Sequence, residues 1–237
     1  MPITAVRLPL SIDRLWRRAV GTFEIDDPRP IAVEAPYTFF LPTDEQLAAI
    51  QPGDEVKIIV RAIPPARKWD AERMWVDVRE ASGDILTGAL DNHPSDIPQL
   101  SVGHVLQFPR SAVIDILWDR NRTDAPPPGR TEREFWERCM VDDCVLSGRS
   151  PVAYIYREEP DMAQPEDKYP DSGWRIRGTA EGIAEDEATD RSPQYVAIAA
   201  VLNRDDSWLH LIDSPVGARF ERDAQSGAFI ACEPEAQ

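Results

Sequence analysis

Two short segments near the C-terminal end place carboxylate, hydroxyl and glycine residues together. One is Asp171-Ser172-Gly173-Trp174, and the other is Asp213-Ser214-Pro215-Val216-Gly217. Asp and Ser side chains bond backbone amides two residues on, and Gly supplies a positive φ, so ordinary turns explain both segments. The alternative is that Asp171, Ser172, Trp174 and the second Asp-Ser pair form a recognition surface, a role that loop residues often have.

Further carboxylates lie close to the first segment. Glu158 and Glu159 end a predicted strand, and an acidic, proline-containing loop continues as far as Pro170. If these carboxylates converged with Asp171 and Asp213, they could support acid–base or metal-assisted hydrolysis. A weak Ca²⁺ or Mg²⁺ site is conceivable, but the spacing does not match a D-x-D-x-D-G loop. A solvated acidic loop is the better interpretation, and we expect no catalytic residue, no metal and no cofactor.

The other residues that commonly carry chemistry form no recognisable constellation. The three histidines, His93, His104 and His210, are scattered, so Ser-His-Asp or Cys-His catalysis lacks a base. The chain contains neither a P-loop nor a G-x-G-x-x-G sequence. The three cysteines, at 139, 144 and 232, fit neither a disulfide framework nor a zinc site, and idle thiols in a reducing compartment are expected.

Charge narrows the class of partner. The chain has a formal net charge of -16, and residues 121–237 hold 13 Lys and Arg against 24 Asp and Glu. Such a surface repels nucleic-acid phosphates and anionic membranes and attracts a basic protein, although acidity can also serve solubility alone. Neither a signal peptide nor a membrane-spanning stretch is read, so we expect a cytoplasmic protein.

Composition predicts two domains joined by a linker. At 237 residues the chain exceeds the commonest single-domain size. Pro126-Pro127-Pro128-Gly129 favours an extended spacer, and the charge balance changes at the same place. We therefore expect a domain over residues 1–122, a linker over 123–130 and an acidic domain over 131–237.

The first half predicts a small antiparallel β-rich domain, bent or barrel-like. Residues 72–80 alternate strictly, and the turn at Ser82-Gly83-Asp84 leads into a second strand over 85–90. Thr43 and Gln46 form a capping box that begins a short helix. An earlier short helix is expected to turn Leu15, Trp16 and Ala19 inward.

The second half predicts an α+β domain with a mostly antiparallel sheet and two helices. A capping box at Thr131 and Glu134 indicates a helix to about residue 138, and Ser192 with Pro193 begins a second one that carries Leu202. Strands are expected over residues 152–157, 174–177, 208–212, 219–222 and 228–232.

Three segments of this half, taken together, resemble a known family. They are Tyr154-Ile155-Tyr156-Arg157-Glu158-Glu159-Pro160, Asp171-Ser172-Gly173-Trp174, and the run from Leu211 through Asp213-Ser214-Pro215-Val216-Gly217 to Arg222. From about Cys139 to Glu233 the chain resembles immunity protein family thirty-three of bacterial polymorphic toxin systems, first catalogued as a domain of unknown function. The resemblance implies an α+β fold and a role in binding rather than catalysis.

A second resemblance covers parts of the first half. Four motifs look like another small bacterial domain of unknown function: Phe40-Leu41-Pro42-Thr43, Pro52-Gly53-Asp54-Glu55-Val56-Lys57, Glu72-Arg73-Met74-Trp75-Val76 and Gly88-Ala89-Leu90-Asp91-Asn92. This resemblance adds information on the fold and almost none on function.

The leading hypothesis is a non-enzymatic immunity protein that neutralises a cognate, possibly basic, toxin by direct binding. The predicted partner-binding residues are Glu158, Glu159, Asp171, Ser172, Trp174, Asp213 and Ser214, with Trp174 as an apolar anchor. The alternatives are a hydrolase that uses the clustered carboxylates, and a regulatory or scaffold protein with an unknown partner. The sequence identifies neither the partner nor the oligomeric state.

Overall fold

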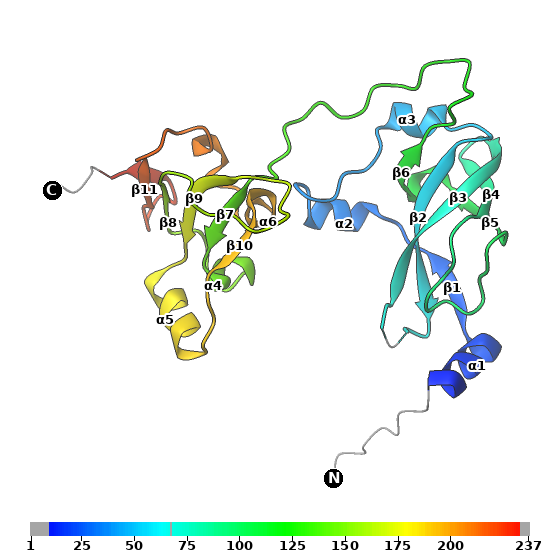
Figure 1. Cartoon of the computed structure of the whole chain (residues 1–237), viewed down its shortest axis with the longest axis horizontal. Helices are drawn as coiled ribbons and strands as arrows, with labels where there is room; N and C mark the ends of the chain where they lie inside the picture. Colours follow the sequence, from blue (N-terminus) through cyan, green and yellow to red (C-terminus); the bar gives the residue numbers. More distant parts are fainter. Residues whose placement is uncertain (1–9, 67, 233–237) are drawn as a thin grey trace, which may run out of the picture. The chain divides into compact units, whose positions relative to one another are not determined.

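The computed structural model describes residues 10–66 and 68–232, which divide into two compact units (Figure 1). The first unit contains the residues up to Val33 together with Phe40–Thr131, and the second contains Glu34–Phe39 together with the residues from Glu132 onward. Residues 123–130 carry no helix or strand. Among the described residues, no helix combines the length and the apolar character needed to cross a bilayer.

The first unit is built around an antiparallel sheet of six strands. Its order is β1-β2-β3-β4-β5, and β6 pairs with the first half of β2 while β1 pairs with the second half. The elements are α1 (Leu10–Val20), β1 (Thr22–Ile25), α2 (Arg29–Glu34, which ends at the boundary between the units), α3 (Asp44–Ala49), β2 (Glu55–Ile63), β3 (Ala71–Ser82), β4 (Ile85–Leu90), β5 (Val105–Pro109), the 3-10 helix η1 (Arg110–Ala112) and β6 (Val113–Leu117).

The core of this unit is formed by apolar residues at alternate positions along the strands. Met74, Val76 and Val78 on β3 are at most 3% exposed, as the sequence pattern predicts, and they pack with the buried residues of β2 and β4. The predicted β3–β4 hairpin is confirmed. The capping box of α3 is also confirmed, because Thr43 accepts from the amide of Gln46 and the Gln46 side chain accepts from the amide of Thr43.

The predicted orientation of α1 is wrong. Leu15 and Trp16 are 68% and 49% exposed, and Ala19 is exposed as well. Arg17 faces the unit instead and is only 5% exposed. Its guanidinium donates to the carbonyl of Pro64, and its own carbonyl accepts from the Gln99 side chain. Polar contacts therefore fix α1 in place, and its apolar side faces outward.

The second unit has a six-stranded sheet in the order β10-β7-β9-β8-β11-β12. β7 and β9 are parallel and the other pairs are antiparallel, so the sheet is mostly antiparallel as predicted. The elements are β7 (Arg138–Val141), α4 (Asp143–Leu146), β8 (Tyr154–Arg157), β9 (Asp171–Arg177), α5 (Ala180–Ala188), β10 (Gln194–Ala197), α6 (Ile198–Leu202), the 3-10 helix η2 (Leu209–Leu211), β11 (Arg219–Arg222) and β12 (Phe229–Ala231).

The segment Glu34–Phe39 is tied to this unit by polar contacts. The Tyr37 amide donates to the side chain of Asn203 at 2.9 Å, and the Tyr37 hydroxyl donates to Asp206 at 2.8 Å. Burial, with the Asp206 carboxylate beside it, raises the pKa of Tyr37 to about 12. The phenol is therefore neutral and remains a hydrogen-bond donor at physiological pH.

Three predicted elements of the second half take a different form. No helix covers residues 131–138, because the carbonyls of Phe135 and Glu137 accept from the amides of Ala199 and Ile198 and hold the chain extended. The helix predicted from Ser192 begins only at Ile198, after the strand β10. Residues 208–212 form a 3-10 turn rather than a strand, with Trp208 and Ile212 both buried four residues apart.

Candidate functional site

The first Asp-Ser segment opens the central strand β9, and its carboxylate is fully engaged. Asp171 accepts hydrogen bonds from the amides of Gly173 and Met162. It also accepts from both terminal nitrogens of Arg175, and each of these two bonds is 2.9 Å long. Burial raises the pKa of Asp171, but the hydrogen bonds from Arg175 and the two amides outweigh it and hold the pKa below its ordinary value. The side chain is therefore an ionised acceptor in a bidentate ion pair.

The next three residues lock this turn into the core. The Ser172 hydroxyl donates to the carbonyl of Arg138 on β7 at 2.6 Å and accepts from the Trp174 amide. Gly173 has a φ of +79°, and a Cβ there would lie 2.1 Å from the carbonyl oxygen of Glu158. Trp174 is 1% exposed, and its indole N–H donates to the carbonyl of Ile212 at 3.1 Å.

Arg157, at the end of β8, connects the two Asp-Ser segments. Its Nε donates to the carbonyl of Ser172 at 3.0 Å, and its Nη1 donates to the carbonyl of Ser214 at 2.7 Å. Its guanidinium also lies 5.7 Å from the centre of the Trp174 ring. Its backbone groups bond Gly217 and Ala218, so one residue fixes the second segment against the first.

The second Asp-Ser segment lies at the surface. The Asp213 side chain is 77% exposed and forms an ion pair with Arg133 at 2.8 Å. Ser214 is partly exposed, and its amide donates to the carbonyl of Leu211. Because both partners of the Asp213–Arg133 pair are largely in water, the pair adds little stability, and its carboxylate stays accessible to a partner.

The two remaining predicted residues come directly after Arg157. The Glu158 amide donates to the carbonyl of Gly173, and its carboxylate, 45% exposed, pairs with Arg175. Arg175 also pairs with Asp161. Its hydrogen bonds with Asp171 and then Glu158 outweigh burial and raise the pKa of this guanidinium. Glu159 is exposed, and within residues 10–66 and 68–232 it has no hydrogen-bond or ion-pair partner.

A cavity of about 160 Å³ lies beside the first segment. Its lining combines Arg133, Glu137, Arg157, Asp171, Trp174 and Ile198, among others. The carboxylates that the sequence analysis grouped together do not converge, because Asp171 and Glu158 share Arg175 whereas Asp213 pairs with Arg133. This arrangement holds chain segments together and presents a rim. Of the two carboxylates that line the cavity, Asp171 is held by Arg175, and Glu137 is partly exposed.

Two of the three cysteines of this unit are packed in its core, and the third, Cys232, is partly exposed. Cys139 and Cys144 are buried and free. Burial and a hydrogen bond with Asp186 raise the pKa of Cys144 to about 11, and burial raises the pKa of Cys139 as well. Both are therefore thiols at physiological pH, and neither is activated as a nucleophile in the free protein.

In the first unit, three carboxylates that the sequence analysis did not connect lie together. Glu55, Asp77 and Asp91 have oxygens within 4.8 Å of one another. They come from β2, β3 and the residue after β4, so only the sheet register brings them together. Burial, followed by the charges of the other two, raises the pKa of Glu55. Two of the three are exposed, and such groups are common on acidic surfaces without an ion.

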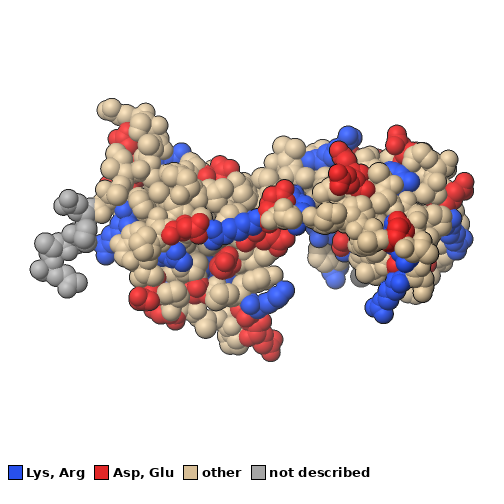
Figure 2. All heavy atoms as spheres, turned by 90° about the horizontal axis from the view of Figure 1, so that it is seen from above, with Lys and Arg blue, Asp and Glu red and all other residues tan. Residues whose placement is uncertain are grey.

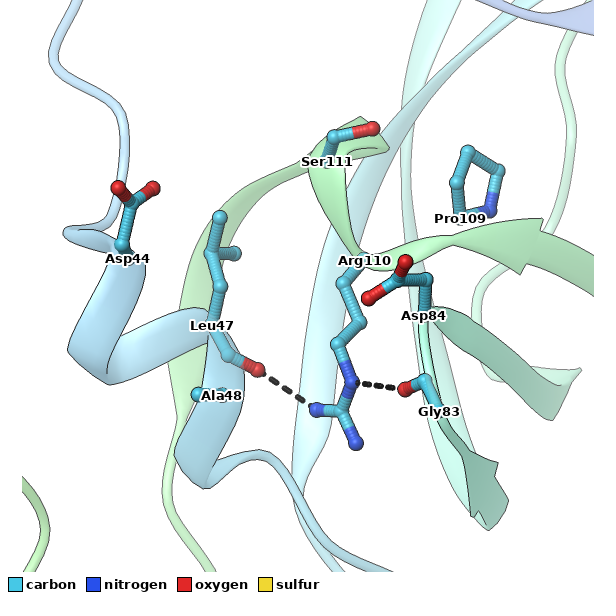
Figure 3. A pocket seen from close by; sticks show the side chains of 8 residues that line it. All are labelled: Asp44, Leu47, Ala48, Gly83, Asp84, Pro109, Arg110 and Ser111. Atoms are coloured by element: carbon cyan, nitrogen blue, oxygen red, sulfur yellow. Dashed lines mark hydrogen bonds between the residues drawn. The ribbon is translucent and has the colours of Figure 1, made fainter.

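A cavity of about 670 Å³ in the same unit surrounds Arg110 (Figure 3). The Arg110 guanidinium donates to the carbonyls of Leu47 and Ile50 at the end of α3 and to Gly83 in the β3–β4 turn. A cation at a helix C-terminus satisfies carbonyls that the helix leaves unpaired. Arg110 therefore joins α3 to the hairpin, which is a structural role.

Comparison with known proteins identifies one part of the chain. Residues 139–233 match the family model of the Immunity protein Imm33 domain, which confirms the resemblance predicted for the C-terminal half. The matched segment contains both Asp-Ser segments and Arg157, and it lies within the second unit. No curated protein and no solved structure matches the chain. The resemblance of the first half to a second small domain stays a prediction.

Sequence reasoning named the acidic and hydroxyl residues of this site but missed the arginines that organise them. Arg157 and Arg175 join five of the seven predicted residues, and Arg133 joins a sixth, which leaves Glu159. One signal was present in the sequence: Asp171 and Arg175 are four apart, and alternate residues of a strand share a face.

Proposed function

We propose that this chain is an immunity protein that neutralises a cognate toxin by binding it directly through the second unit. The observation that carries the proposal is the match of residues 139–233 to the Immunity protein Imm33 domain. The same residues build a surface rim over the partly buried Arg157 and the buried Arg175, which supply the support that a binding surface needs.

The geometry divides the predicted partner-binding residues into two roles. Glu158, Glu159, Asp213 and Ser214, which we call the acidic rim, are at least partly exposed and can touch a partner. Asp171, Ser172 and Trp174 are at most 8% exposed, so they support the rim from beneath. Trp174 would thus act through the position of Arg157 and Ile212, not as an anchor inserted into the partner.

Charge favours a basic surface on the toxin. Figure 2 shows acidic and basic side chains interspersed on the face that it presents, so a specific patch must provide any directional attraction. The acidic rim carries three carboxylates, and residues 121–237 have 11 more acidic than basic side chains. A basic partner would be steered to such a surface, and its association rate would fall as salt rises.

The test is co-purification with the products of neighbouring genes, since immunity genes lie beside their toxin genes. We expect one basic product to form a stoichiometric complex and to lose its toxicity in that complex. The double variant Glu159→Lys/Asp213→Lys should weaken the complex at least about tenfold, mainly through a slower association rate. Glu80→Lys, an exposed charge reversal in the first unit, is the matched control and should leave affinity within about twofold.

Three outcomes would count against the proposal. If no neighbouring product binds, neutralisation by direct binding is wrong and a regulatory or scaffold role gains weight. If Glu80→Lys weakens the complex while the rim variant does not, the interface lies in the first unit. Loss of cooperative unfolding in the rim variant would show that these residues are structural.

A further inference from the structure

Glu34–Phe39 belongs to the second unit but lies far outside the residues that match the family model. Within this segment, the amide of Thr38 donates to the carbonyl of Ala35 at 3.1 Å and closes a turn over Pro36 and Tyr37. Proline is favoured at the second position of such a turn because its φ is already fixed. The turn leaves the Tyr37 amide unused, so this amide can bond another segment.

Two residues of the matched segment hold this turn. Asn203, directly after α6, accepts from the Tyr37 amide at 2.9 Å and donates to the Thr38 hydroxyl at 2.7 Å. Asp206 accepts from the Tyr37 hydroxyl at 2.8 Å. Because one amide side chain bonds two consecutive residues and a third bond holds the tip of the ring, the turn is fixed in one orientation on the unit.

The Tyr37 ring packs against Phe135, and Phe135 also supports an arginine. The two rings meet edge to face with their centres 6.2 Å apart, and Phe135 is 8% exposed. The Arg133 guanidinium lies 5.0 Å from the centre of the Phe135 ring, a distance at which the ring attracts a cation. Arg133 in turn donates to both carboxylate oxygens of Asp213, at 2.8 and 2.9 Å. A continuous series of contacts therefore runs from Tyr37 to the acidic rim.

We propose that Tyr37 is a positioning residue of the toxin-binding surface, acting on Asp213 of the acidic rim through the two side chains between them. This inference rests on the proposed function of the rim, and it gives a role there to a segment that the family match does not include. Tyr37 acts without touching the toxin. An exposed carboxylate that is already held in one orientation loses less conformational entropy when the partner arrives, so the complex is tighter.

The ring contacts matter because the ion pair alone fixes Asp213 weakly. The side chains of Arg133 and Asp213 are 49% and 77% exposed, and the attraction between groups so largely in water is small. The main chain of Phe135 is held independently, since its carbonyl accepts from the Ala199 amide at 2.9 Å. Tyr37 therefore restrains the ring of Phe135 rather than its backbone. Without Tyr37, this ring can turn into the vacated space and no longer supports Arg133.

Nuclear magnetic resonance of the purified full chain tests this series of contacts in the free protein. Tyr37→Ala should shift the resonances of the Arg133 side-chain N–H and of the Asp213 amide, because the ring that supports them has moved. Tyr37→Phe keeps the ring and loses only the hydrogen bond to Asp206, so these two resonances should stay at their wild-type positions. Trp69→Ala removes an exposed aromatic side chain of the first unit and is the control that should also leave them unchanged.

A double-mutant cycle measures the consequence for binding to the neighbouring gene product that forms the complex. Tyr37→Ala should weaken this complex at least about threefold in the otherwise unchanged chain. In the Asp213→Ala background the same substitution should change the affinity less than about 1.5-fold, because the carboxylate that Tyr37 positions is gone. In the Glu159→Gln background the loss should persist, since among the described residues Glu159 has no hydrogen-bond or ion-pair partner.

The other outcomes overturn the inference. Rim resonances that stay in place in Tyr37→Ala would show that Tyr37 does not act on Asp213. An equal loss of affinity in the Asp213→Ala background would show that Tyr37 acts by another route, such as direct contact. If no neighbouring product binds, the proposed function is wrong, and the resonances alone decide whether Tyr37 positions Asp213. Should Tyr37→Ala fail to fold, Tyr37→Leu fills the space without a ring edge and carries the same expectations.

Discussion

The two Asp-Ser segments contain the same residue types, yet one is buried in the fold and the other lies at the surface. The Asp171 side chain is 2% exposed and the Asp213 side chain is 77% exposed. Both segments contain a glycine with positive φ, +79° at Gly173 and +91° at Gly217. A Cβ on Gly173 would meet the backbone of Glu158, whereas nothing lies within 4 Å of one on Gly217. The local chain conformation is similar and the environment is not.

The difference comes from the elements into which the two segments lead. Asp171 begins β9, which lies between β7 and β8 and continues into the buried Trp174 and Ile176. The segment at Asp213 comes after a 3-10 turn and leads into β11, near the edge of the sheet. Turn-forming residues thus specify a backbone shape, and the apolar residues beside them decide whether it stabilises the fold or faces a partner.

The largest effect should come from removing the apolar residue of the first segment. Trp174→Ala deletes a side chain that is 1% exposed, packs edge-on against Trp208 at 5.7 Å and donates to the Ile212 carbonyl. We expect a loss of about 3–5 kcal/mol in the free energy of unfolding. Urea denaturation measures it. A loss below about 1 kcal/mol, with weaker binding of the toxin, would instead make Trp174 a surface anchor.

A smaller effect should separate the two glycines. Gly173→Ala places a methyl group 2.1 Å from the Glu158 carbonyl oxygen, so β8 and β9 must move apart. The hydrogen bond from the Glu158 amide to the Gly173 carbonyl then weakens. We expect a loss of about 2–3 kcal/mol, from the positive φ and the lost contact. In Gly217→Ala only the positive φ is unfavourable, so the free energy of unfolding should fall by about 1 kcal/mol. Equal losses measured by urea denaturation would show that the two turns are equally constrained.

Alternation and turn chemistry made much of the fold predictable. Met74, Val76 and Val78 on β3 indicate a half-buried strand, and Ser82-Gly83-Asp84 indicates the hairpin, because both signals are local. The capping box at Thr43 is local too. An equally good capping box at Thr131 failed, because the carbonyls of Phe135 and Glu137 gain partners from α6 that no local rule can anticipate.

The site was predictable in its turn chemistry and not in its connections. The bond from the Gly173 amide to Asp171 is what an Asp-x-Gly turn predicts. The role of Arg157 depends on carbonyls 15 and 57 residues away, and only the register of β8 with β9 and β11 brings them together. The outward orientation of the apolar face of α1 was also unpredictable. The helix is held by hydrogen bonds of Arg17 with Pro64 and Gln99, which are distant in the sequence, and not by apolar contacts.

The smallest effect should come from Asp213, and its contrast with Asp171 depends on pH. Asp171→Asn keeps the shape but weakens the bidentate pair with Arg175, so we expect a loss of about 1–3 kcal/mol at neutral pH. Because the pKa of Asp171 is lowered in the folded state, its stabilisation is complete above the unfolded pKa of about 3.9 and is lost as pH falls through the folded value. The difference in the free energy of unfolding between wild type and variant should therefore narrow below about pH 4 in urea denaturation at several pH values.

Asp213→Asn, at a solvent-exposed pair, should lower the free energy of unfolding by less than about 0.5 kcal/mol at neutral pH. A gap for Asp171→Asn that stays constant down to acid pH would mean that packing, and not the ion pair, makes this turn part of the core.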